Sequence, residues 1–429
     1  MAKQWIQTNR DRRKERVVLL GLVLRASGAD RSAPLAELSQ LAETAGAEVV
    51  GSATQRAPRF NAATYIGSGK AQEVRGLVAR TEADTVICDH DLNPAQVRNL
   101  ERMLDTKVID RSELILDIFA MHARTRQAKL QVEIAQLEYM LPRLVGMWSH
   151  FERPEGAIGT RGPGETQLET DRRLVRRRHS KLKRELANIG KRRARQVSAR
   201  QSVFTACLVG YTNAGKSTLM NALTGAGVLV QDQLFATLDT KSVRWEVAKN
   251  RFAVLSDTVG FIKRLPHHLV ASFHATLEEA THADLLLHVA DAAHPHCEEQ
   301  VENVNEVLRE LGCFGRPLVT VLNKADRVDD PAQLVMLQDR YPQHVVISAL
   351  KGDGLQALCD RVLEDMSRRF AEVRVAAAPG DGRLLAFLRG NAQVIEEQSD
   401  EDAVRVAALI DRQLLGQLRQ MSDSVEVRS

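Results

Sequence analysis

The chain has 429 residues, 44% of them hydrophobic, with a formal net charge of +4 at pH 7 and 5 scattered cysteines without a C-x-x-C pair. This length is sufficient for about three globular domains, and the cysteine pattern indicates a reducing compartment. We expect a cytoplasmic protein without a transmembrane segment, because no apolar run approaches the roughly 18 residues of a membrane span and the basic N-terminus lacks the apolar core of a secretory signal.

The first 110 residues alternate between strand and helix signals. Apolar runs predict strands over 17–24, 48–50, 85–89 and 106–110, and helical spacing predicts helices over 35–45, 72–80 and 94–104. Strands that alternate with helices of about ten residues are typical of a mainly parallel sheet. We therefore expect an N-terminal α/β domain over residues 1–110.

A short segment in this domain, Tyr65-Ile-Gly-Ser-Gly-Lys70, has some likeness to a phosphate-binding loop. It lacks the four-residue gap that such loops have between their glycines. A strand-to-helix turn is the favoured interpretation, and a second nucleotide site or a surface for a partner are the alternatives.

Residues 111–199 are predicted to form an antiparallel helical hairpin. One long helix is expected from Ser112 to Leu144, and apolar residues recur at heptad spacing within it and again from Leu168 to Ile189. The Gly- and Pro-rich segment 156–165 separates the two stretches. Two long helices with matching apolar seams and a short connection favour a hairpin.

The second helix of the expected hairpin is strongly basic. Residues 171–200 contain 13 Lys and Arg but only 2 Asp and Glu, whereas the rest of the chain has more acidic than basic residues. A charged run of this kind can be an ordinary solvated helix face. Because acidic residues are almost absent and few aromatic side chains could stack on bases, contact with the phosphate backbone of structured RNA is the favoured interpretation.

Strand and helix signals alternate again after residue 200. Buried strands are expected over 203–209, 252–256, 284–290, 317–322 and 344–347, with helices between them. This pattern predicts a doubly wound sheet over residues 200–370. A break at Pro379-Gly-Asp-Gly382 is followed by what we expect to be a small C-terminal α/β unit, assigned to residues 371–429.

The chain is organised around one motif, Gly210-Tyr-Thr-Asn-Ala-Gly-Lys-Ser217, which has the G-x-x-x-x-G-K-S spacing of a phosphate-binding loop. An apolar strand precedes it and a helix follows it, as the motif requires. Backbone N–H groups of such a loop cradle phosphates, the Lys216 side chain reaches the β- and γ-phosphates, and the Ser217 hydroxyl binds Mg²⁺.

Two further segments are expected beside the phosphates. Asp257-Thr-Val-Gly260 follows a predicted strand, so that Asp257 can hold the Mg²⁺ shell and the Gly260 N–H can bond the γ-phosphate. Phe235-Ala-Thr-Leu-Asp239 lies between the two motifs and is expected to supply a switch threonine that completes the Mg²⁺ coordination. Thr237 is our choice for that threonine, and Thr240 is the alternative.

Two segments near the end of this domain indicate that the base is guanine. In Asn323-Lys-Ala-Asp326, the Asp326 carboxylate can accept hydrogen bonds from guanine N1 and N2, which adenine cannot donate. Asn323 would tie loops together and the stem of Lys324 would cover the base plane. Ser348-Ala-Leu350 would offer backbone N–H groups to the guanine oxygen.

The predicted catalytic residues are Lys216, Thr237 and Gly260, and the predicted Mg²⁺ ligands are Ser217, Thr237 and Asp257. The predicted nucleotide contacts are Gly210, Tyr211, Thr212, Asn213, Ala214, Gly215, Lys216, Ser217, Thr218, Phe235, Ala236, Thr237, Leu238, Asp239, Asp257, Thr258, Val259, Gly260, Asn323, Lys324, Asp326, Ser348, Ala349 and Leu350.

The motifs in this order, GYTNAGKS, FATLD, DTVGF, NKAD and SAL, resemble the G domain of the translational GTPase superfamily. The turn at residues 65–70 and the segment from Gly159 to Arg173 are similar to those of the HflX family. The resemblance covers nearly the whole chain. It implies a cytoplasmic GTPase that binds the large ribosomal subunit and its RNA and splits stalled ribosomes, with the N-terminal domain and hairpin reaching into the subunit.

One absence bears on catalysis. Phe261 follows Gly260 at the position where many GTPases have a glutamine that orients the attacking water. We therefore expect slow hydrolysis in the free protein, completed on a partner. Asn213 resembles the asparagine that binds potassium in some related GTPases, so K⁺ is a second candidate cation beside Mg²⁺.

Three functions are compatible with these features. The first is a GTPase that acts on ribosomes, the second is a nucleotide-regulated protein that binds or remodels free structured RNA, and the third is a regulator of another protein. We expect a monomer that binds GTP and GDP. Use of ATP through a second surface stays open.

Overall fold

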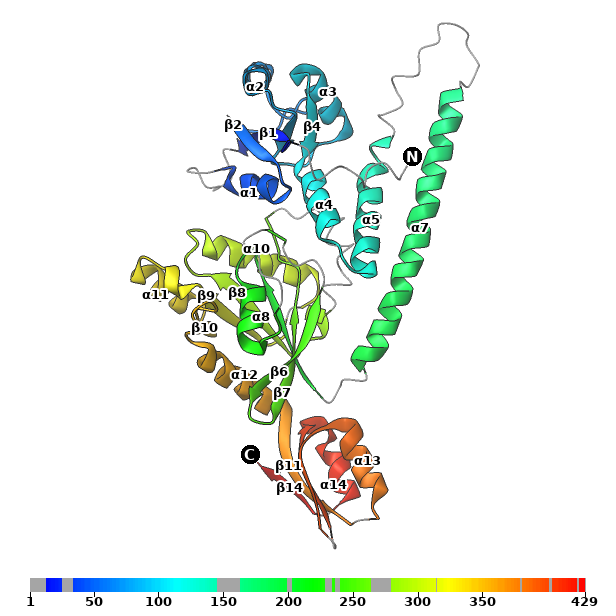
Figure 1. Ribbon diagram of the computed structural model, residues 1–429, viewed down its shortest axis with the longest axis vertical. Helices are drawn as coiled ribbons and strands as arrows, with labels where there is room; N and C mark the ends of the chain where they lie inside the picture. Colours follow the sequence, from blue (N-terminus) through cyan, green and yellow to red (C-terminus); the bar gives the residue numbers. More distant parts are fainter. Residues whose placement is uncertain are drawn as a thin grey trace. The chain divides into compact units, whose positions relative to one another are not determined.

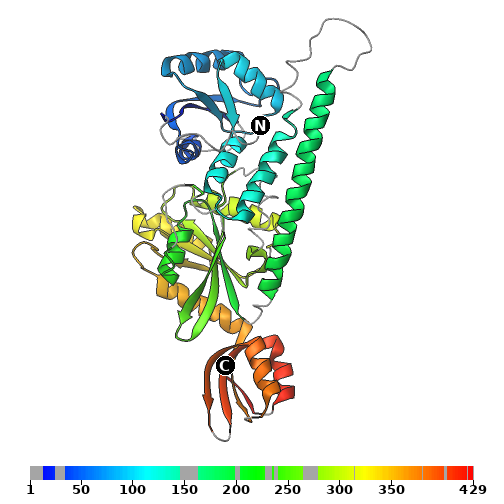
Figure 2. The same cartoon turned by 45° about the vertical axis from the view of Figure 1, so that its right-hand side comes forward.

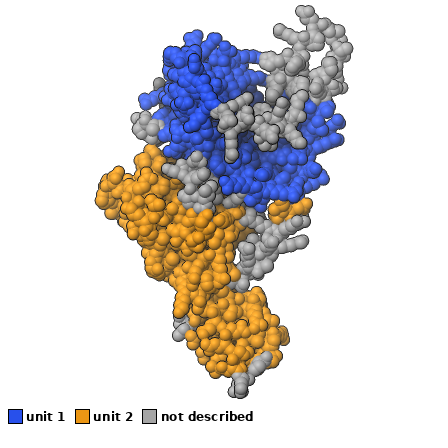
Figure 3. Space-filling view, viewed as in Figure 1, with its two compact units in different colours: residues 1–186, 233–235, 265–272 blue, residues 187–232, 236–264, 273–429 orange. Residues whose placement is uncertain are grey.

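Three β-sheets lie along the chain in the computed structural model (Figure 1). Contacts divide the chain into two units, which Figure 3 shows in different colours: unit 1 is residues 1–186, 233–235 and 265–272, and unit 2 is residues 187–232, 236–264 and 273–429. The structure describes residues 13–24, 34–144, 163–198, 203–227, 234–235, 240–263, 279–313, 315–378, 380–400, 403–422 and 424–428, with side chains of the long helix described over 169–190.

The N-terminal sheet has four parallel strands in the order β2-β1-β3-β4. Its buried core includes Leu20, Val74 and Leu100. The expected α/β domain is therefore present, although β2 is much longer than the predicted 48–50, because its polar, half-exposed residues give a weak strand signal. The elements are β1 (Arg16–Leu24), α1 (Ala36–Thr44), β2 (Glu48–Ala57), α2 (Ser68–Thr81), β3 (Thr85–Cys88), α3 (Pro94–Leu104) and β4 (Lys107–Asp110).

The segment 65–70 forms the turn from β2 into α2, which agrees with the favoured interpretation. The Gly67 N–H donates to Gln55 Oε1 at 2.9 Å, and Gly67 is the N-cap of α2. The Tyr65 hydroxyl lies 2.8 Å from His90 Nδ1, with 1% of the residue exposed. The Lys70 ammonium pairs with the Glu73 carboxylate at 2.7 Å.

The prediction of one continuous helix over 112–144 is wrong. Two helices, α4 (Arg111–His122) and α5 (Arg126–Met140), occupy this stretch and pack on each other. Ala123 is extended, and the Thr125 side chain caps α5 by accepting from the Ala128 N–H at 3.1 Å. A threonine N-cap stabilises a helix start, which explains a break that apolar spacing alone does not reveal.

The long basic helix, α7 (Pro163–Ser198), begins earlier than predicted, so that Pro163 to Glu165 belong to the helix. Residues 156–162 of the expected loop lie outside the described residues. The helices α5 and α7 are antiparallel and lie side by side (Figure 1 and Figure 2). Arg126 near the start of α5 pairs with Glu185 of α7, and Glu138 near the end of α5 lies 2.8 Å from His179. The predicted hairpin is thus formed by α5 and α7.

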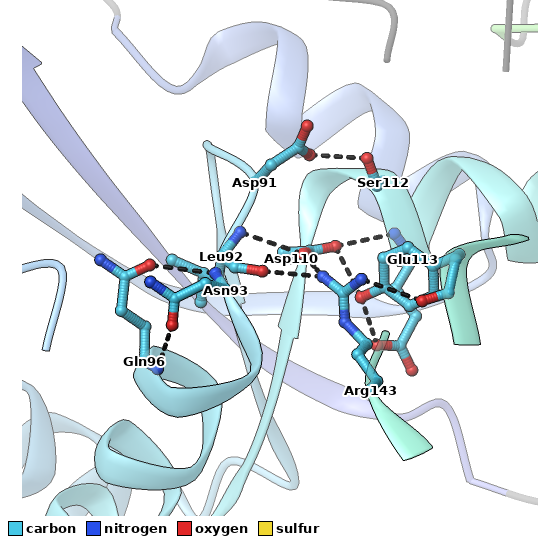
Figure 4. A network of polar contacts seen from close by, with 9 residues as sticks. Asp91, Leu92, Asn93, Gln96, Asp110, Ser112, Glu113 and Arg143 are labelled. Atoms are coloured by element: carbon cyan, nitrogen blue, oxygen red, sulfur yellow. Dashed lines mark hydrogen bonds and ion pairs between the residues drawn. The ribbon is translucent and has the colours of Figure 1, made fainter. Parts of the chain in front are cut away.

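A buried polar network joins the N-terminal sheet to the helices of unit 1 (Figure 4). Asp110, at the end of β4, is fully buried and accepts hydrogen bonds from the Leu92 N–H, the Glu113 N–H, the Tyr139 hydroxyl and the Arg143 guanidinium at 2.7–3.1 Å. Arg143 also stacks on the Tyr139 ring, 3.4 Å from its centre. Burial raises the pKa of Asp110, and Arg143 opposes that rise. Since a buried carboxylate is costly without such partners, the network fixes α5 relative to β4.

The second sheet has six strands in the order β10-β9-β8-β5-β7-β6, and only β6 is antiparallel to its neighbour. Helices α8 and α12 pack their apolar faces onto this sheet. This is the predicted doubly wound sheet. Its elements are β5 (Phe204–Gly210), α8 (Lys216–Thr224), β6 (Lys241–Ala248), β7 (Arg251–Asp257), β8 (Leu285–Asp291), α10 (Cys297–Glu310), β9 (Leu318–Asn323), the 3₁₀ helix η1 (Ala325–Arg327), α11 (Pro331–Arg340), β10 (His344–Val346) and α12 (Leu355–Arg369).

The C-terminal sheet is antiparallel, in the order β12-β13-β11-β14. Its first strand directly follows α12, ahead of the break at 379–382, and Phe370 packs edge-to-face on Phe204 of β5 at 6.4 Å. The elements of this C-terminal unit are β11 (Phe370–Ala377), α13 (Gly382–Asn391), β12 (Ala392–Ser399), β13 (Val404–Asp411), the 3₁₀ helix η2 (Arg412–Leu414), α14 (Leu415–Met421) and β14 (Val425–Arg428).

None of the described helices is long and apolar enough to cross a membrane.

Candidate nucleotide-binding site

The phosphate loop connects β5 to α8, at the carboxyl end of a central strand of the six-stranded sheet. Both motif glycines have left-handed backbone, and a Cβ on Gly210 would lie 2.2 Å from the Val289 carbonyl oxygen, while one on Gly215 would lie 2.3 Å from Asn323 Nδ2. Only glycine fits at either position. The first motif glycine thus lets β5 approach β8, and the second lets the loop approach β9.

The Lys216 side chain is folded under the loop. Its ammonium donates to the carbonyl oxygens of Gly210 at 3.0 Å and Tyr211 at 2.7 Å, and 6% of the residue is exposed. Burial lowers the pKa of Lys216 to about 8, although the Asp257 carboxylate acts in the opposite direction. The ammonium is therefore mostly protonated at neutral pH, as a phosphate ligand requires.

The segment after β7 docks on the phosphate loop. The Thr212 N–H donates to the Phe261 carbonyl at 2.7 Å, and the Phe261 N–H donates to the Gly210 carbonyl at 3.1 Å. A Cβ on Gly260 would lie 2.8 Å from Thr212 Cα and 3.0 Å from Lys216 Nζ. Gly260 is thus required by close approach to the loop. The Phe261 ring is buried, with 2% of the residue exposed.

The pair Ser217 and Asp257 offers oxygen ligands to a hard cation. The Ser217 hydroxyl donates to Asp257 Oδ2 at 2.6 Å, while Oδ1 of the fully buried Asp257 carboxylate has no hydrogen-bond partner among the described residues. Burial raises the pKa of Asp257, and Lys216 and Ser217 oppose that rise. An unpartnered buried carboxylate oxygen next to a hydroxyl fits Mg²⁺, which is bound by a few such oxygens together with water and phosphates.

The predicted base-binding motif lies at the end of β9 and holds the phosphate loop in place. Asn323 Nδ2 donates to the Ala214 carbonyl at 2.9 Å, and its Oδ1 accepts from the Ala349 N–H at 3.0 Å. The Lys324 ammonium donates to the Asn213 carbonyl at 2.8 Å. The prediction that Asn323 ties loops together therefore agrees with the contacts.

Asp326, the residue predicted to contact the guanine edge, belongs to the 3₁₀ helix η1 that follows β9. A hydrogen bond from the Ser348 side chain holds the pKa of Asp326 below its ordinary value, so this carboxylate is ionised at neutral pH. Ser348 is buried and Leu350 is 80% exposed. The three predicted elements, loop, Asn323–Asp326 and Ser348–Leu350, thus meet at one edge of the sheet.

The predicted switch segment is only partly described. Ala236, Thr237, Leu238 and Asp239 lie outside the described residues, so Thr237 as a Mg²⁺ ligand stays a prediction. Phe235 is grouped with unit 1, where its ring packs edge-to-face on Phe119 of α4 with centres 4.7 Å apart. This apolar packing occupies the Phe235 side chain, which sequence reasoning had placed among the nucleotide contacts.

Sequence reasoning missed two residues of this region. His288, in the middle of β8, is buried, and burial together with Lys216 lowers its pKa to about 4, so it is neutral at pH 7. Asp291, at the end of the same strand, pairs with Lys324 at 2.7 Å. Neither belongs to a recognisable motif, but the rule that polar residues at the carboxyl end of a parallel strand face the ligand could have indicated Asp291.

Comparison with known protein families agrees with this geometry. Three family models match consecutive parts of the chain: "GTP-binding GTPase N-terminal" over residues 32–120, "GTP-binding GTPase Middle Region" over 122–200 and "50S ribosome-binding GTPase" over 205–324. The doubly wound sheet, the phosphate loop and these matches define a P-loop GTPase, a class that uses Mg²⁺ with its nucleotide.

Full-length relatives identify the family. GTPase HflX of Lacrimispora saccharolytica is 43% identical over 96% of this chain and 97% of its own length. GTPase HflX of Escherichia coli is 45% identical over 86% of this chain and 87% of its own. The chain belongs to the HflX family of GTPases. A GTP-binding protein from Sulfolobus solfataricus, solved in complex with GDP, is 27% identical over 82% of this chain and 99% of that chain, with a TM-score of 0.42.

Proposed function

We propose that this GTPase binds the large ribosomal subunit through ribosomal RNA and splits or rescues stalled ribosomes. In the GTP state the protein binds the RNA. The bound protein then separates the ribosomal subunits or prevents them from rejoining, and GTP hydrolysis releases the protein from the subunit. It acts in the cytoplasm as a monomer. The four segments 1–110, 111–199, 200–370 and 371–429 divide this work into an N-terminal domain, a helical arm, a GTP-binding domain and a C-terminal domain.

The distribution of cations on α7 is the observation that supports RNA binding most strongly. The face of α7 toward α5 is neutralised, because Arg178 pairs with Glu133 at 2.8 Å and Lys183 pairs with Glu138 at 2.9 Å. Leu182 is buried on the same face. Four exposed cations on the opposite face form no ion pair with any residue that the structure describes, and we call them the basic stripe: Arg173, Arg177, Lys181 and Arg184.

The spacing of the basic stripe suits a phosphate backbone. Its residues follow one another at intervals of four, four and three, so they lie on one face of the helix, roughly 6 Å apart along its axis. A row of unneutralised cations attracts a polyanion and is not needed for packing. Within unit 1, the Asp110 network fixes α5, and α5 holds α7, so the stripe is carried on a rigid support.

The nucleotide site supplies the switch in this proposal. Lys216 and the loop N–H groups bind the phosphates, Ser217 and Asp257 hold Mg²⁺ together with the predicted ligand Thr237, and Asp326 reads guanine. Bound Mg²⁺ would neutralise charge on the β- and γ-phosphates. Asn213 is the candidate residue for K⁺, and equal rates in sodium and potassium would remove that assignment. The proposed cycle requires no ATP.

Hydrolysis in the free protein should be slow, on the order of 10⁻³ s⁻¹ or less, because nothing at position 261 can orient water. Both backbone polar groups of Phe261 bond the phosphate loop, and its ring is buried. GTP turnover should therefore rise when large subunits or assembled ribosomes are added, and remain slow with duplex RNA or without additions. Lys216→Ala is the control that should show no turnover in any mixture.

The GTP turnover measured in each mixture distinguishes the candidate functions. Stimulation by any duplex RNA would replace the proposal with action on free RNA, and absence of stimulation in all mixtures would favour regulation of another protein. Fast turnover of the protein alone would contradict the role that we give to Phe261.

A further inference from the structure

Asp291 lies beside the base-binding motif as a consequence of strand pairing. Strands β8 and β9 are parallel neighbours, and their register places Asp291, the last residue of β8, opposite Asn323, the last residue of β9. Lys324 follows directly, and its ammonium lies 2.7 Å from Asp291 Oδ2. Both side chains are mostly buried, with 18% of Lys324 and 14% of Asp291 exposed. Such a partly desolvated pair is less screened by solvent than a surface pair.

Each partner of this pair is fixed by a further contact. Asp291 Oδ1 accepts from the Ala293 N–H at 3.1 Å, which orients the carboxylate. The Lys324 ammonium also donates to the Asn213 carbonyl in the phosphate loop at 2.8 Å. Lys324 itself has a left-handed backbone, with φ of 62°. A strained conformation at a non-glycine residue persists only where surrounding contacts determine it.

We propose that Asp291 is a positioning residue for guanine nucleotides. By holding the Lys324 ammonium at the end of β8, it keeps the four-carbon stem extended across the place where the base plane is expected to lie. Without Asp291, the Lys324 ammonium would keep its hydrogen bond to the Asn213 carbonyl but lose its charged partner. The side chain would then sample more rotamers, and its charge would turn toward the nucleotide phosphates. The inference rests on the proposed role of Lys324 at the base.

Loss of the Asp291 charge should lower the affinity for purine nucleotides without changing the selectivity between bases. The Lys324 stem over the base plane contacts every purine base in the same way, whereas Asp326 discriminates between purines by the groups on their edges. Asp291→Asn retains an oxygen that can accept from the Ala293 N–H but removes the charge that holds Lys324. We expect this variant to bind GDP and inosine diphosphate more weakly by the same factor, roughly tenfold, with faster release of a fluorescent GDP.

A double-mutant cycle tests whether the effect passes through Lys324. Lys324→Met keeps an apolar stem and removes the ammonium, so adding Asp291→Asn in that background should change GDP affinity no further. The unfolding midpoint of each variant, measured without nucleotide, is the control for folding. A lowered midpoint with unchanged GDP affinity would assign Asp291 a structural role only.

Three results would overturn the inference: unchanged or tighter GDP binding, additive effects of the two substitutions, or a changed ratio of GDP to inosine diphosphate affinity. Failure of guanine recognition itself gives a different pattern, because Asp326→Asn would then leave base selectivity unaltered, whatever Asp291→Asn does.

Discussion

Asp326→Asn should exchange the base preference of this GTPase from guanine to xanthine. The carboxylate of Asp326 can accept from both N1–H and the 2-amino group of guanine, whereas an asparagine can accept only once and would direct its NH₂ group at the other position. Xanthine has a carbonyl at that position, so the asparagine amide complements it. We expect the ratio of GDP to xanthosine diphosphate affinity to change by on the order of 10³ or more, measured by displacement of a fluorescent nucleotide.

The matched control for this substitution lies in the same loop. Asp329 is exposed three residues further along, and Asp329→Asn removes one negative charge close to Asp326 in the sequence. It should leave both affinities unchanged. If both variants weaken GDP binding equally without any gain for xanthosine diphosphate, the loop acts through its charge and Asp326 does not read the base edge.

Removal of the basic stripe should weaken binding to the large ribosomal subunit by on the order of 10²-fold at low salt. The variant replaces Arg173, Arg177, Lys181 and Arg184 with alanine, which leaves the ion pairs of Arg178 and Lys183 with α5 intact. Each lost phosphate contact should reduce the slope of log affinity against log salt by ~0.7–0.9. Cosedimentation with large subunits over a salt series gives both quantities.

A control with the same loss of charge separates local contact from general attraction. Four other exposed cations lie outside α7 and have no ion pair within the described part of the chain: Lys249, Arg340, Arg383 and Arg419. Alanine at these four positions should leave the salt slope unchanged. Equal losses in both variants would mean that net charge, and not the stripe, drives association. GDP affinity should be the same in both, because neither variant touches the nucleotide site.

The sequence predicts what depends on short-range chemistry. The phosphate loop, the turn into α2 and the helix over 94–104 follow from glycine spacing, capping and apolar periodicity, and the structure has all three. Periodicity failed between α4 and α5, because α4 ends at the extended Ala123 and the Thr125 cap begins α5 without disturbing the apolar spacing. Helix propensities alone do not tell whether one capping hydrogen bond stabilises the chain more than continuation of the helix would.

Contacts between residues far apart in the chain could not be predicted from the sequence, for a different reason. The Asp110 network brings together residues separated by up to 51 positions, and the Asp291–Lys324 pair depends on which strands are neighbours in the sheet. Similarly, the basic run of α7 predicts an RNA surface, but only its ion pairs with α5 separate Arg178 from the basic stripe. Those contacts become visible once strand order and helix packing are known.

In the proposed cycle, GTP in the phosphate-loop site controls how tightly the protein binds the large subunit. The most direct measurement is the affinity of the wild-type protein for isolated large subunits, with a non-hydrolysable GTP analogue and with GDP, at one salt concentration. We expect at least tenfold tighter binding with the analogue, and loss of that difference in the Lys216→Ala variant. Equal affinity in the two nucleotide states would contradict it.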